Sequence, residues 1–188
     1  MPRYEGILVT WNSHVNTSAA GADIDKDQIE LNIYSPSDTA RNLRATPSFT
    51  FSLVNDPTLF YKASLTGSNE PGFSELPENA FEERSGYHYP KDASVVHLCE
   101  VKEYSEHEIQ DEFGKSVVFE VKGEVTKKIG KGEFIQRENP LVEAMVHATR
   151  LSLLEGERKE KLKGKIYKAL ENQNDELSKK ILEYVEGS

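Results

Sequence analysis

Cysteine is almost absent from this chain, because only Cys99 among its 188 residues carries a thiol. One thiol excludes an internal disulfide framework and the usual structural zinc clusters, which need several thiolate or imidazole ligands. The sequence also lacks a basic leader followed by an apolar segment, and it has no run of about 18 apolar residues that could span a bilayer. These absences predict a cytoplasmic protein with no membrane-spanning part and no metal site.

Positive charge is also in short supply. The chain has 23 Lys and Arg against 32 Asp and Glu, which gives a formal net charge of −9 at pH 7. Nucleic acids and anionic lipids are bound mainly by basic side chains, so this balance argues against both as general partners. We therefore expect small molecules or proteins as partners.

The common nucleotide-binding and hydrolase signatures are missing too. The chain contains no P-loop, no Gly-x-Gly-x-x-Gly and no Gly-x-Ser-x-Gly sequence. His97 and Cys99 lie two residues apart in a predicted strand and face the same way, but two ligands without a nearby carboxylate make a poor metal site. We interpret both as core residues.

Short runs in which apolar and polar residues alternate are typical of half-buried strands. A helix is expected over 58–65, because Asp56 and Pro57 form a strong helix start. Several strands with short connections and one early helix predict a mainly β, α+β protein with an antiparallel barrel or sandwich. The expected strands cover residues 4–11, 29–34, 48–54, 93–104, 115–126 and 134–136.

Beyond residue 140 the apolar period becomes helical, with one helix expected over 141–154 and two more in the remaining tail. Residues 1–154 carry the whole negative charge, whereas the tail is neutral. This shift predicts a main domain over 1–154 and a helical appendage over 155–188. The stretch 66–83 has no periodicity, and we interpret it as a long surface loop, either a functional lid or interface piece or simply a mobile segment.

Residues 12–22 form a stretch of small or polar side chains, Asn-Ser-His-Val-Asn-Thr-Ser-Ala-Ala-Gly-Ala. Such a stretch lets a flat group approach the backbone closely, although an ordinary hairpin loop has the same composition. His14 is its most exposed candidate for chemistry.

The connection between the second and third predicted strands concentrates hydrogen-bond donors. Hydroxyls and amides bind a phosphate at low desolvation cost, and a guanidinium adds a charge-assisted contact. Asp38 is expected to cap a short helix whose free N–H groups would add to the same anion site. The alternative is a capped turn with a solvated arginine. The donors are Ser35, Ser37, Thr39, Arg41 and Asn42.

Glu143, His147 and Arg150 fall on one stripe of the predicted 141–154 helix by spacings of four and three. Such a trio can orient an imidazole for acid–base work. It can equally be an ion-pair set at a surface or an interface.

The succession of several short pieces resembles the flavin-reductase-like, FMN-binding split barrels, in particular a mainly archaeal group of uncharacterised proteins among them. Order and spacing agree over about residues 4–154. The matching pieces are Tyr4-Glu5-Gly6-Ile7, the small-residue stretch 16–22, Ser37-x-Thr39-x-x-Asn42-Leu43, Val54-Asn55-Asp56-Pro57 with Leu59-Phe60, and Arg137 with Val142-Glu143-Ala144 and Ala148-Thr149-Arg150-Leu151.

This resemblance implies a six-stranded split barrel that is usually a homodimer, with FMN at the subunit interface. The phosphate would be held by Asp38, Thr39 and Asn42, with Ser37 and Arg41 as neighbours. The isoalloxazine ring would lie along a loop before the second strand, formed by Asn16, Thr17, Ser18, Ala19 and Ala20.

The function that the resemblance implies is an FMN-dependent oxidoreductase. Because the flavin itself accepts and passes on the electrons, no catalytic side chain is required. The donor could be a nicotinamide or a deazaflavin. The alternatives are a noncatalytic FMN-binding or protein-interaction module and a barrel that has lost its FMN.

Overall fold

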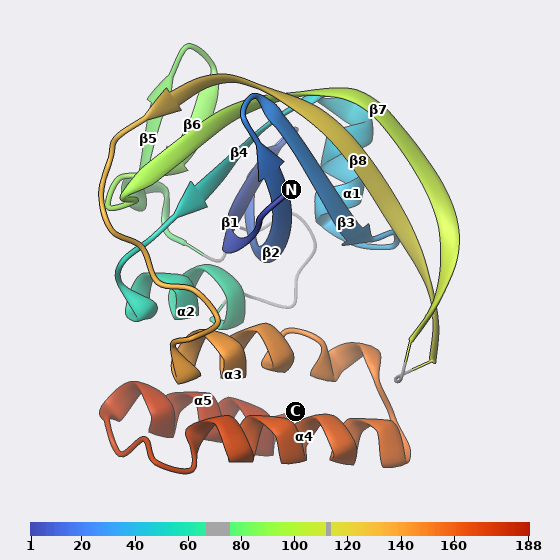
Figure 1. Cartoon of the computed structure of the whole chain (residues 1–188), viewed down its shortest axis with the longest axis vertical. Helices are drawn as coiled ribbons and strands as arrows, with labels where there is room; N and C mark the ends of the chain where they lie inside the picture. The colour runs from blue at the N-terminus through green and yellow to red at the C-terminus, as the bar shows by residue number, and fades with distance from the viewer. Residues whose placement is uncertain (67–75, 112–113) are drawn as a thin grey trace.

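The computed structural model describes residues 1–66, 76–111 and 114–188, so half of the predicted loop over 66–83 lies outside the described residues. Six antiparallel strands close into a barrel in the order β1-β2-β3-β8-β7-β4 (Figure 1). The predicted six-stranded antiparallel barrel is therefore confirmed. Its strands are β1 (Arg3–Trp11), β2 (Val15–Asp25), β3 (Gln28–Tyr34), β4 (Ser48–Leu53), β7 (Val95–Asp111) and β8 (Gly114–Ile129).

Outside the barrel, the regular structure of the described residues consists of helices and one small hairpin. The short helix α1 (Asp38–Ala45) follows β3, and α2 (Pro57–Leu65) follows β4. As predicted, the Asp56 side chain caps α2, because its Oδ1 accepts a hydrogen bond of 2.7 Å from the Thr58 N–H. The remaining elements are η1 (Glu78–Ala80), β5 (Phe81–Arg84), β6 (Tyr87–Pro90), α3 (Pro140–Ala148), η2 (Leu151–Leu153), α4 (Gly156–Leu170) and α5 (Glu176–Gly187).

The prediction of a loop over the small-residue stretch is wrong, because most of this stretch forms β2. Its residues pair with β1 in an unbroken antiparallel register from Trp11↔Val15 to Arg3↔Asp23. Small residues have low strand propensity, but cross-strand pairing with a well-formed neighbour overrides it. The small side chains thus lie on a strand with a fixed direction.

The predicted strand over 134–136 is also wrong, because these residues form no strand in the structure. The Gln136 side chain instead reproduces the hydrogen bonds of a strand neighbour. Its Oε1 accepts from the Glu5 N–H at 2.7 Å, and its Nε2 donates to the Glu5 carbonyl at 3.0 Å. One side-chain amide thereby covers the edge of β1 beyond the end of β4.

Two apolar clusters share β1 between them. The barrel interior contains Leu8 of β1 with Phe49, Phe51 and Phe119, and His97 and Cys99 are buried as expected. The second cluster lies outside the barrel, where Ile7 and Val9 face α2 and the three C-terminal helices. β1 is consequently buried on both faces, which agrees with its continuous apolar run.

The C-terminal helices form a layer beneath the barrel (Figure 1). The helix predicted over 141–154 ends at Ala148. The chain turns at Thr149 and then forms a short 3-10 helix that buries Leu151. The two tail helices are confirmed as α4 and α5. Their apolar faces join the same cluster as α3, and the division at residue 154 stays a prediction. Among the described residues, no helix has both the length and the apolar composition that crossing a bilayer requires.

The long strands β7 and β8 extend beyond the barrel as an arm. β7 pairs with β4 only as far as Glu100, and β8 pairs with β3 only from Val118 onward. Register shifts after Leu98 and Val101 mark bulges, which bend paired strands. Figure 1 shows the arm curving from the barrel towards α4.

Candidate functional site

The closed barrel splits at one end, where β2 and β3 diverge. These strands pair only over Ala22–Asp25 of β2, whereas the preceding part of β2, residues 15–21, pairs with β1 alone. β3 meanwhile follows β8 to its end at Tyr34. The free edge of β2 therefore offers unpaired backbone N–H and C=O groups on alternate residues.

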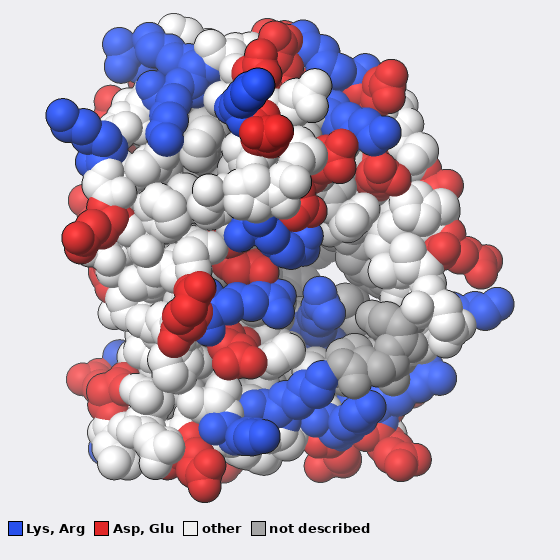
Figure 2. All heavy atoms as spheres, viewed as in Figure 1, with Lys and Arg blue, Asp and Glu red and all other residues white. Residues whose placement is uncertain are grey.

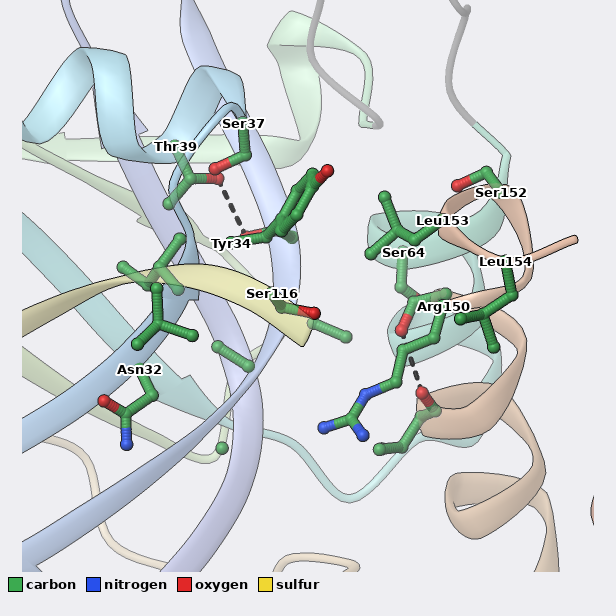
Figure 3. Close-up of a pocket in the computed structure, with 18 of the residues that line it drawn as sticks. Asn32, Tyr34, Ser37, Thr39, Ser64, Ser116, Arg150, Ser152, Leu153 and Leu154 are labelled. Atoms are coloured by element: carbon green, nitrogen blue, oxygen red, sulfur yellow. Dashed lines mark hydrogen bonds between the residues drawn. The ribbon is translucent and has the colours of Figure 1, made fainter. Parts of the chain in front are cut away.

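A cavity of about 1250 Å³ lies at this opening. One wall is formed by β2, the end of β3, the start of α1 and the tip of β8, and the other by the segment from α3 to α4. Figure 3 shows Tyr34, Ser37 and Thr39 on the barrel side facing Leu153 and Leu154 on the helical side, with the Arg150 side chain extending into the space between them.

The sequence-predicted residues divide into two groups. Six of them line the cavity and four do not. The lining group contains Thr17, Ser18, Ala19, Ala20, Ser37 and Thr39. The other group contains Asn16, Asp38, Arg41 and Asn42.

Thr39 joins the free edge of β2 to α1. Its Oγ1 accepts a hydrogen bond of 3.1 Å from Asn16 Nδ2 and lies 3.2 Å from Ser18 Oγ. All three residues are at least partly buried, so these contacts fix the start of α1 against the strand. Asn16 thus acts behind the cavity wall rather than on its surface.

The N-terminus of α1 opens towards the cavity, with Ser37 rather than Asp38 as its cap. Ser37 Oγ accepts a hydrogen bond of 3.2 Å from the Ala40 N–H. Asp38 pairs with Arg41 at 2.5 Å on the exposed side of the helix, and Asn42 Nδ2 donates to Thr10 Oγ1 at 3.2 Å. The free N–H groups and the dipole of α1 favour an anion at this end.

The cavity is basic although the chain is acidic. Five Lys or Arg and three Glu line it, and Figure 2 shows blue side chains gathered around a hollow in the middle of the molecule. The basic residues are Arg3, Lys115, Arg137, Arg150 and Arg158, and the acidic ones are Glu5, Glu155 and Glu157. The net effect of this lining is to attract anionic ligands.

Glu5 is the buried acid of the cavity wall. Its side chain is only 4% exposed, and its Oε1 lies 2.7 Å from Arg137 Nε and 3.9 Å from Arg3 Nε. Arg3 also pairs with Asp23 at 2.9 Å. Its guanidinium lies over Gly21, where a Cβ would overlap it. Two arginines are therefore held along the cavity by one buried carboxylate.

Several of the exposed residues that line the cavity have large apolar side chains. Tyr34 is 40% and Leu153 47% exposed, and both line the cavity. Ile109, from the β7–β8 arm, also lines the cavity and is 37% exposed. Exposed apolar groups that gather in this way mark a binding surface.

Glu143, His147 and Arg150 do not form one site. His147 Nε2 lies 3.9 Å from Glu143 Oε1, but its side chain is only 14% exposed and neither residue lines the cavity. Arg150 lines the cavity beyond the end of α3. Burial lowers the pKa of His147, and the neighbouring Arg137 lowers it further. The trio is therefore not an acid–base set at the cavity.

His147 predicts a pH dependence of stability. Its Nδ1 is buried without a hydrogen-bond partner among the described residues, so burial, the main cause of its lowered pKa, keeps the ring neutral. The unfolded chain binds a proton that the folded one rejects, so stability is lost as pH falls below the unfolded value of about 6.5. We expect urea denaturation between about pH 7.5 and about pH 5.5 to show a smaller loss in His147→Gln than in the unaltered protein.

The control for this prediction is His14→Gln, since His14 is exposed. Burial lowers the pKa of His97 as well, but that histidine remains in every variant compared. An identical pH dependence in His147→Gln and His14→Gln would contradict the prediction.

The other candidates for chemistry lie away from the cavity. Burial raises the pKa of the Cys99 thiol, which keeps it protonated and unreactive inside the barrel. Across residues 1–66, 76–111 and 114–188, no group of three His, Cys, Asp or Glu is placed to hold a metal ion.

Sequence reasoning missed the helical wall and the arm. Arg150, Arg158, Lys115 and Ser116 line the cavity but come from segments far from β2 in sequence. Of these, the sequence singled out only Arg150, in the piece Ala148-Thr149-Arg150-Leu151 and in the stripe with Glu143 and His147, but neither pattern placed it at the FMN site.

Comparison with known proteins shows what this architecture resembles. Among curated proteins, none is detectably similar in sequence to this chain. The structure is similar to the FMN-bound protein MM1853 of Methanosarcina mazei, with 20% identity, a TM-score of 0.65, and 97% of this chain and 93% of that chain covered.

Two further solved structures share the barrel. Flavoredoxin from Methanosarcina acetivorans is 12% identical with a TM-score of 0.55, covering 71% of this chain and 72% of that chain. The NADH:FAD oxidoreductase SgcE6 of Streptomyces globisporus is 14% identical with a TM-score of 0.55, covering 69% and 76%. At these identities the likeness shows a shared fold.

The family itself follows from the sequence. Residues 4–129 match the model described as "Protein of unknown function (DUF447) N-terminal domain", and the Methanosarcina mazei protein carries the same family name. The expected resemblance to flavin-reductase-like split barrels is confirmed by these neighbours. The chain belongs to the DUF447 family.

Proposed function

We propose that this protein binds FMN noncovalently and acts as a flavin reductase-like oxidoreductase. The observation that carries the proposal is the cavity at the split of the barrel, where the free edge of β2 and the N-terminus of α1 meet under a basic lining. The similar Methanosarcina mazei protein is described as FMN-bound, which supports the same ligand.

The residues of the cavity fit each part of FMN. A flat isoalloxazine ring can approach the backbone of β2 closely, because Ser18, Ala19 and Ala20 have small side chains. The phosphate fits the N-terminus of α1, where Ser37 and Thr39 add hydroxyls. The volume of about 1250 Å³ exceeds the roughly 300–1,000 Å³ of most ligand pockets, so room for the cofactor is ample.

The four predicted residues outside the lining take indirect roles in this proposal. Asn16 holds Thr39, Asn42 holds Thr10, and the Asp38–Arg41 pair closes the outer side of α1. When bound, FMN would supply the hydride and electron chemistry. The task of the protein is then to bind and orient the flavin and to keep its phosphate charge balanced.

We also propose a homodimer with FMN near its interface. The exposed apolar residues around the mouth of the cavity, Tyr34 and Leu153 among them, would be covered by the second subunit. The single buried Cys99 is compatible with a cytoplasmic location, which we retain as part of the proposal.

A noncatalytic FMN-binding or protein-interaction module is the second candidate. The observation that favours it is that, among the described residues, the cavity lining contains no His and no Cys that could move a proton near neutral pH. Flavin reduction itself needs no such residue, so reductant addition separates the two candidates.

The experiment is a visible absorption spectrum of the purified protein before and after FMN addition and gel filtration. We expect flavin bands to travel with a protein that elutes as a dimer, and to bleach with NAD(P)H or a reduced deazaflavin. Bands that never bleach would favour the noncatalytic module. A protein that stays colourless after FMN addition would overturn the cofactor assignment.

A further inference from the structure

A buried acid holds Arg137 at the cavity wall. The Nε of Arg137 lies 2.7 Å from Glu5 Oε1, and the Glu5 side chain is only 4% exposed. The Arg137 side chain is 46% exposed and lines the cavity. The backbone of Glu5 is itself fixed, because the side chain of Gln136 hydrogen-bonds both its N–H and its carbonyl. Glu5 therefore anchors this guanidinium to β1.

The terminal nitrogens of Arg137 are not used by this contact. In the part of the chain that the structure describes, the guanidinium is bound only through Nε, and neither Nη has a hydrogen bond or an ion pair. Arg3 differs, because its Nη1 donates to Asp23 at 2.9 Å. The two arginines and the two acids, Glu5 and Asp23, carry no net charge together. What Arg137 offers the cavity is therefore a set of free N–H donors rather than an excess of positive charge.

The register of β1 and β2 places this guanidinium beside the small-residue strand. Glu5 pairs with Gly21, and Ala19 lies two residues before Gly21 and so faces the same side of the sheet. Both Ala19 and Gly21 line the cavity. At about 3.3 Å per residue, Gly21 lies about 10 Å along β2 from Ser18, whose Oγ is 3.2 Å from Thr39 Oγ1. The guanidinium therefore lies at the other end of this strand segment from α1.

A flavin bound as proposed brings its ring to this guanidinium. With the phosphate at the N-terminus of α1, the ribityl chain carries the ring along β2 towards Gly21. The pyrimidine edge of the isoalloxazine accepts hydrogen bonds at N1 and at the C2 and C4 carbonyls, whereas the dimethylbenzene end has no acceptor. The free donors of Arg137 therefore match the pyrimidine edge.

Reduction adds negative charge at that edge of the ring. A hydride donor of the proposed kind, a nicotinamide or a deazaflavin, gives up a C–H bond, and its two electrons and proton form an N–H bond at N5 of the ring. The ring thereby gains one negative charge, which resides on N1 and the C2 carbonyl oxygen. A guanidinium attracts an anionic acceptor more strongly than a neutral carbonyl, so a guanidinium at this edge binds the reduced ring more tightly than the oxidised ring.

We infer that Arg137, held by Glu5, contacts the pyrimidine edge of the bound flavin and favours its reduced, anionic form. This inference rests on the proposed function, because it needs a flavin on the β2 wall. It gives one residue beside the barrel the task of raising the reduction potential of the cofactor, which is a role separate from binding its phosphate.

The test is the reduction potential of FMN bound to the full chain, measured by anaerobic titration with dithionite beside a reference dye. In Arg137→Gln we expect the Kd of reduced FMN, relative to that of oxidised FMN, to rise about tenfold. This change lowers the potential by about 30 mV for a two-electron couple. A contact with the phosphate would instead weaken both forms equally and leave the potential unchanged. Arg137→Lys keeps the charge with fewer donors and should lower the potential by less.

The matched control is Arg84→Gln, which removes the same charge from an exposed residue outside the cavity lining and should leave the potential unchanged. Urea denaturation checks every variant, because Arg137→Gln leaves the Glu5 carboxylate buried without its closest partner. Glu5→Gln with Arg137→Gln avoids that cost by removing both charges. We expect the potential to fall in this double variant too, since the donors at the ring edge are lost.

An unchanged or higher potential in Arg137→Gln and in the double variant, with FMN still bound, would overturn the inference and leave the proposed function standing. An equal fall in Arg84→Gln would also overturn it, because the effect would then come from net charge alone. If the unaltered protein binds no FMN, the proposed function fails and the inference fails with it.

Discussion

Ala19→Leu is expected to abolish FMN binding while leaving the fold intact. Ala19 lies on the free edge of β2, opposite Ile7 of β1, and lines the cavity together with Ser64 of α2 and Val146 of α3. A leucine there adds three carbon atoms at the proposed position of the isoalloxazine ring, and the ring cannot approach the strand past them. We expect the Kd of FMN to rise at least about 100-fold, equivalent to about 2.8 kcal/mol.

Fluorescence titration of FMN measures this effect, and urea denaturation measures the fold. Ala19 is partly buried against the apolar cluster outside the barrel, so we expect the added atoms to lower the free energy of unfolding by about 1–3 kcal/mol, the usual cost of overpacking, without unfolding the protein. The control is Ala169→Leu, the same change on α4 outside the cavity lining. If Ala19→Leu binds FMN as tightly as the control does, the ring does not lie along this strand.

Phe119→Ala is expected to cause a large loss of stability, about 3–5 kcal/mol. Phe119 is fully buried in the barrel interior, on β8 between β3 and β7. The Arg44 guanidinium of α1 lies 4.6 Å from its ring centroid, and the Tyr104 ring lies 4.9 Å away. The substitution leaves a cavity in a close-packed interior and removes the surface on which α1 rests.

The measurement is the free energy of unfolding in urea, with FMN affinity as a second readout. Because α1 carries Ser37 and Thr39, we expect FMN affinity to fall as well. Tyr104→Ala is the control, since that ring is 56% exposed and its loss should cost less than about 1 kcal/mol. Equal losses in the two variants would show that the ring pair, rather than burial, provides the stability.

Features set by neighbouring residues were predictable from the sequence. The start of α2 depends on Asp56 and Pro57, and both act within one helical turn. The first strand was recognisable because its residues are buried on both faces and form a continuous apolar run. The connection before α1 likewise carried its hydroxyls in its own sequence, so Ser37 and Thr39 were found.

Features set by partners distant in sequence were not predictable. Residues 16–20 look like a loop, and only their register with β1 makes them a strand. Most of Phe81–Arg84 was read as the end of a long loop, and Tyr87–Pro90 was not predicted as a strand, because strands of four residues carry little periodicity. Gln136 takes the place of a strand neighbour through its side chain, which no backbone pattern encodes.

The candidate site also contains features set by neighbouring residues and features set by partners distant in sequence. The hydroxyls of the α1 connection were found from their spacing, but the orientation of Arg41 depends on its pairing with Asp38. The arginines at 150 and 158 come to the cavity only because the β7–β8 arm and the helical layer meet there. The tertiary fold, rather than the local sequence, decides which basic side chains line the cavity.

The hydrogen bonds between the Gln136 side chain and the Glu5 backbone matter for folding during synthesis as well as for the finished structure. The edge of β1 at Glu5 is completed by a residue 131 positions later. At a translation rate of about 5–20 residues per second, roughly 7–26 s separate the synthesis of the two residues. During that interval a nascent chain exposes a strand edge and an acid, Glu5, that still lacks Arg137, its partner at 2.7 Å, which follows one residue after Gln136.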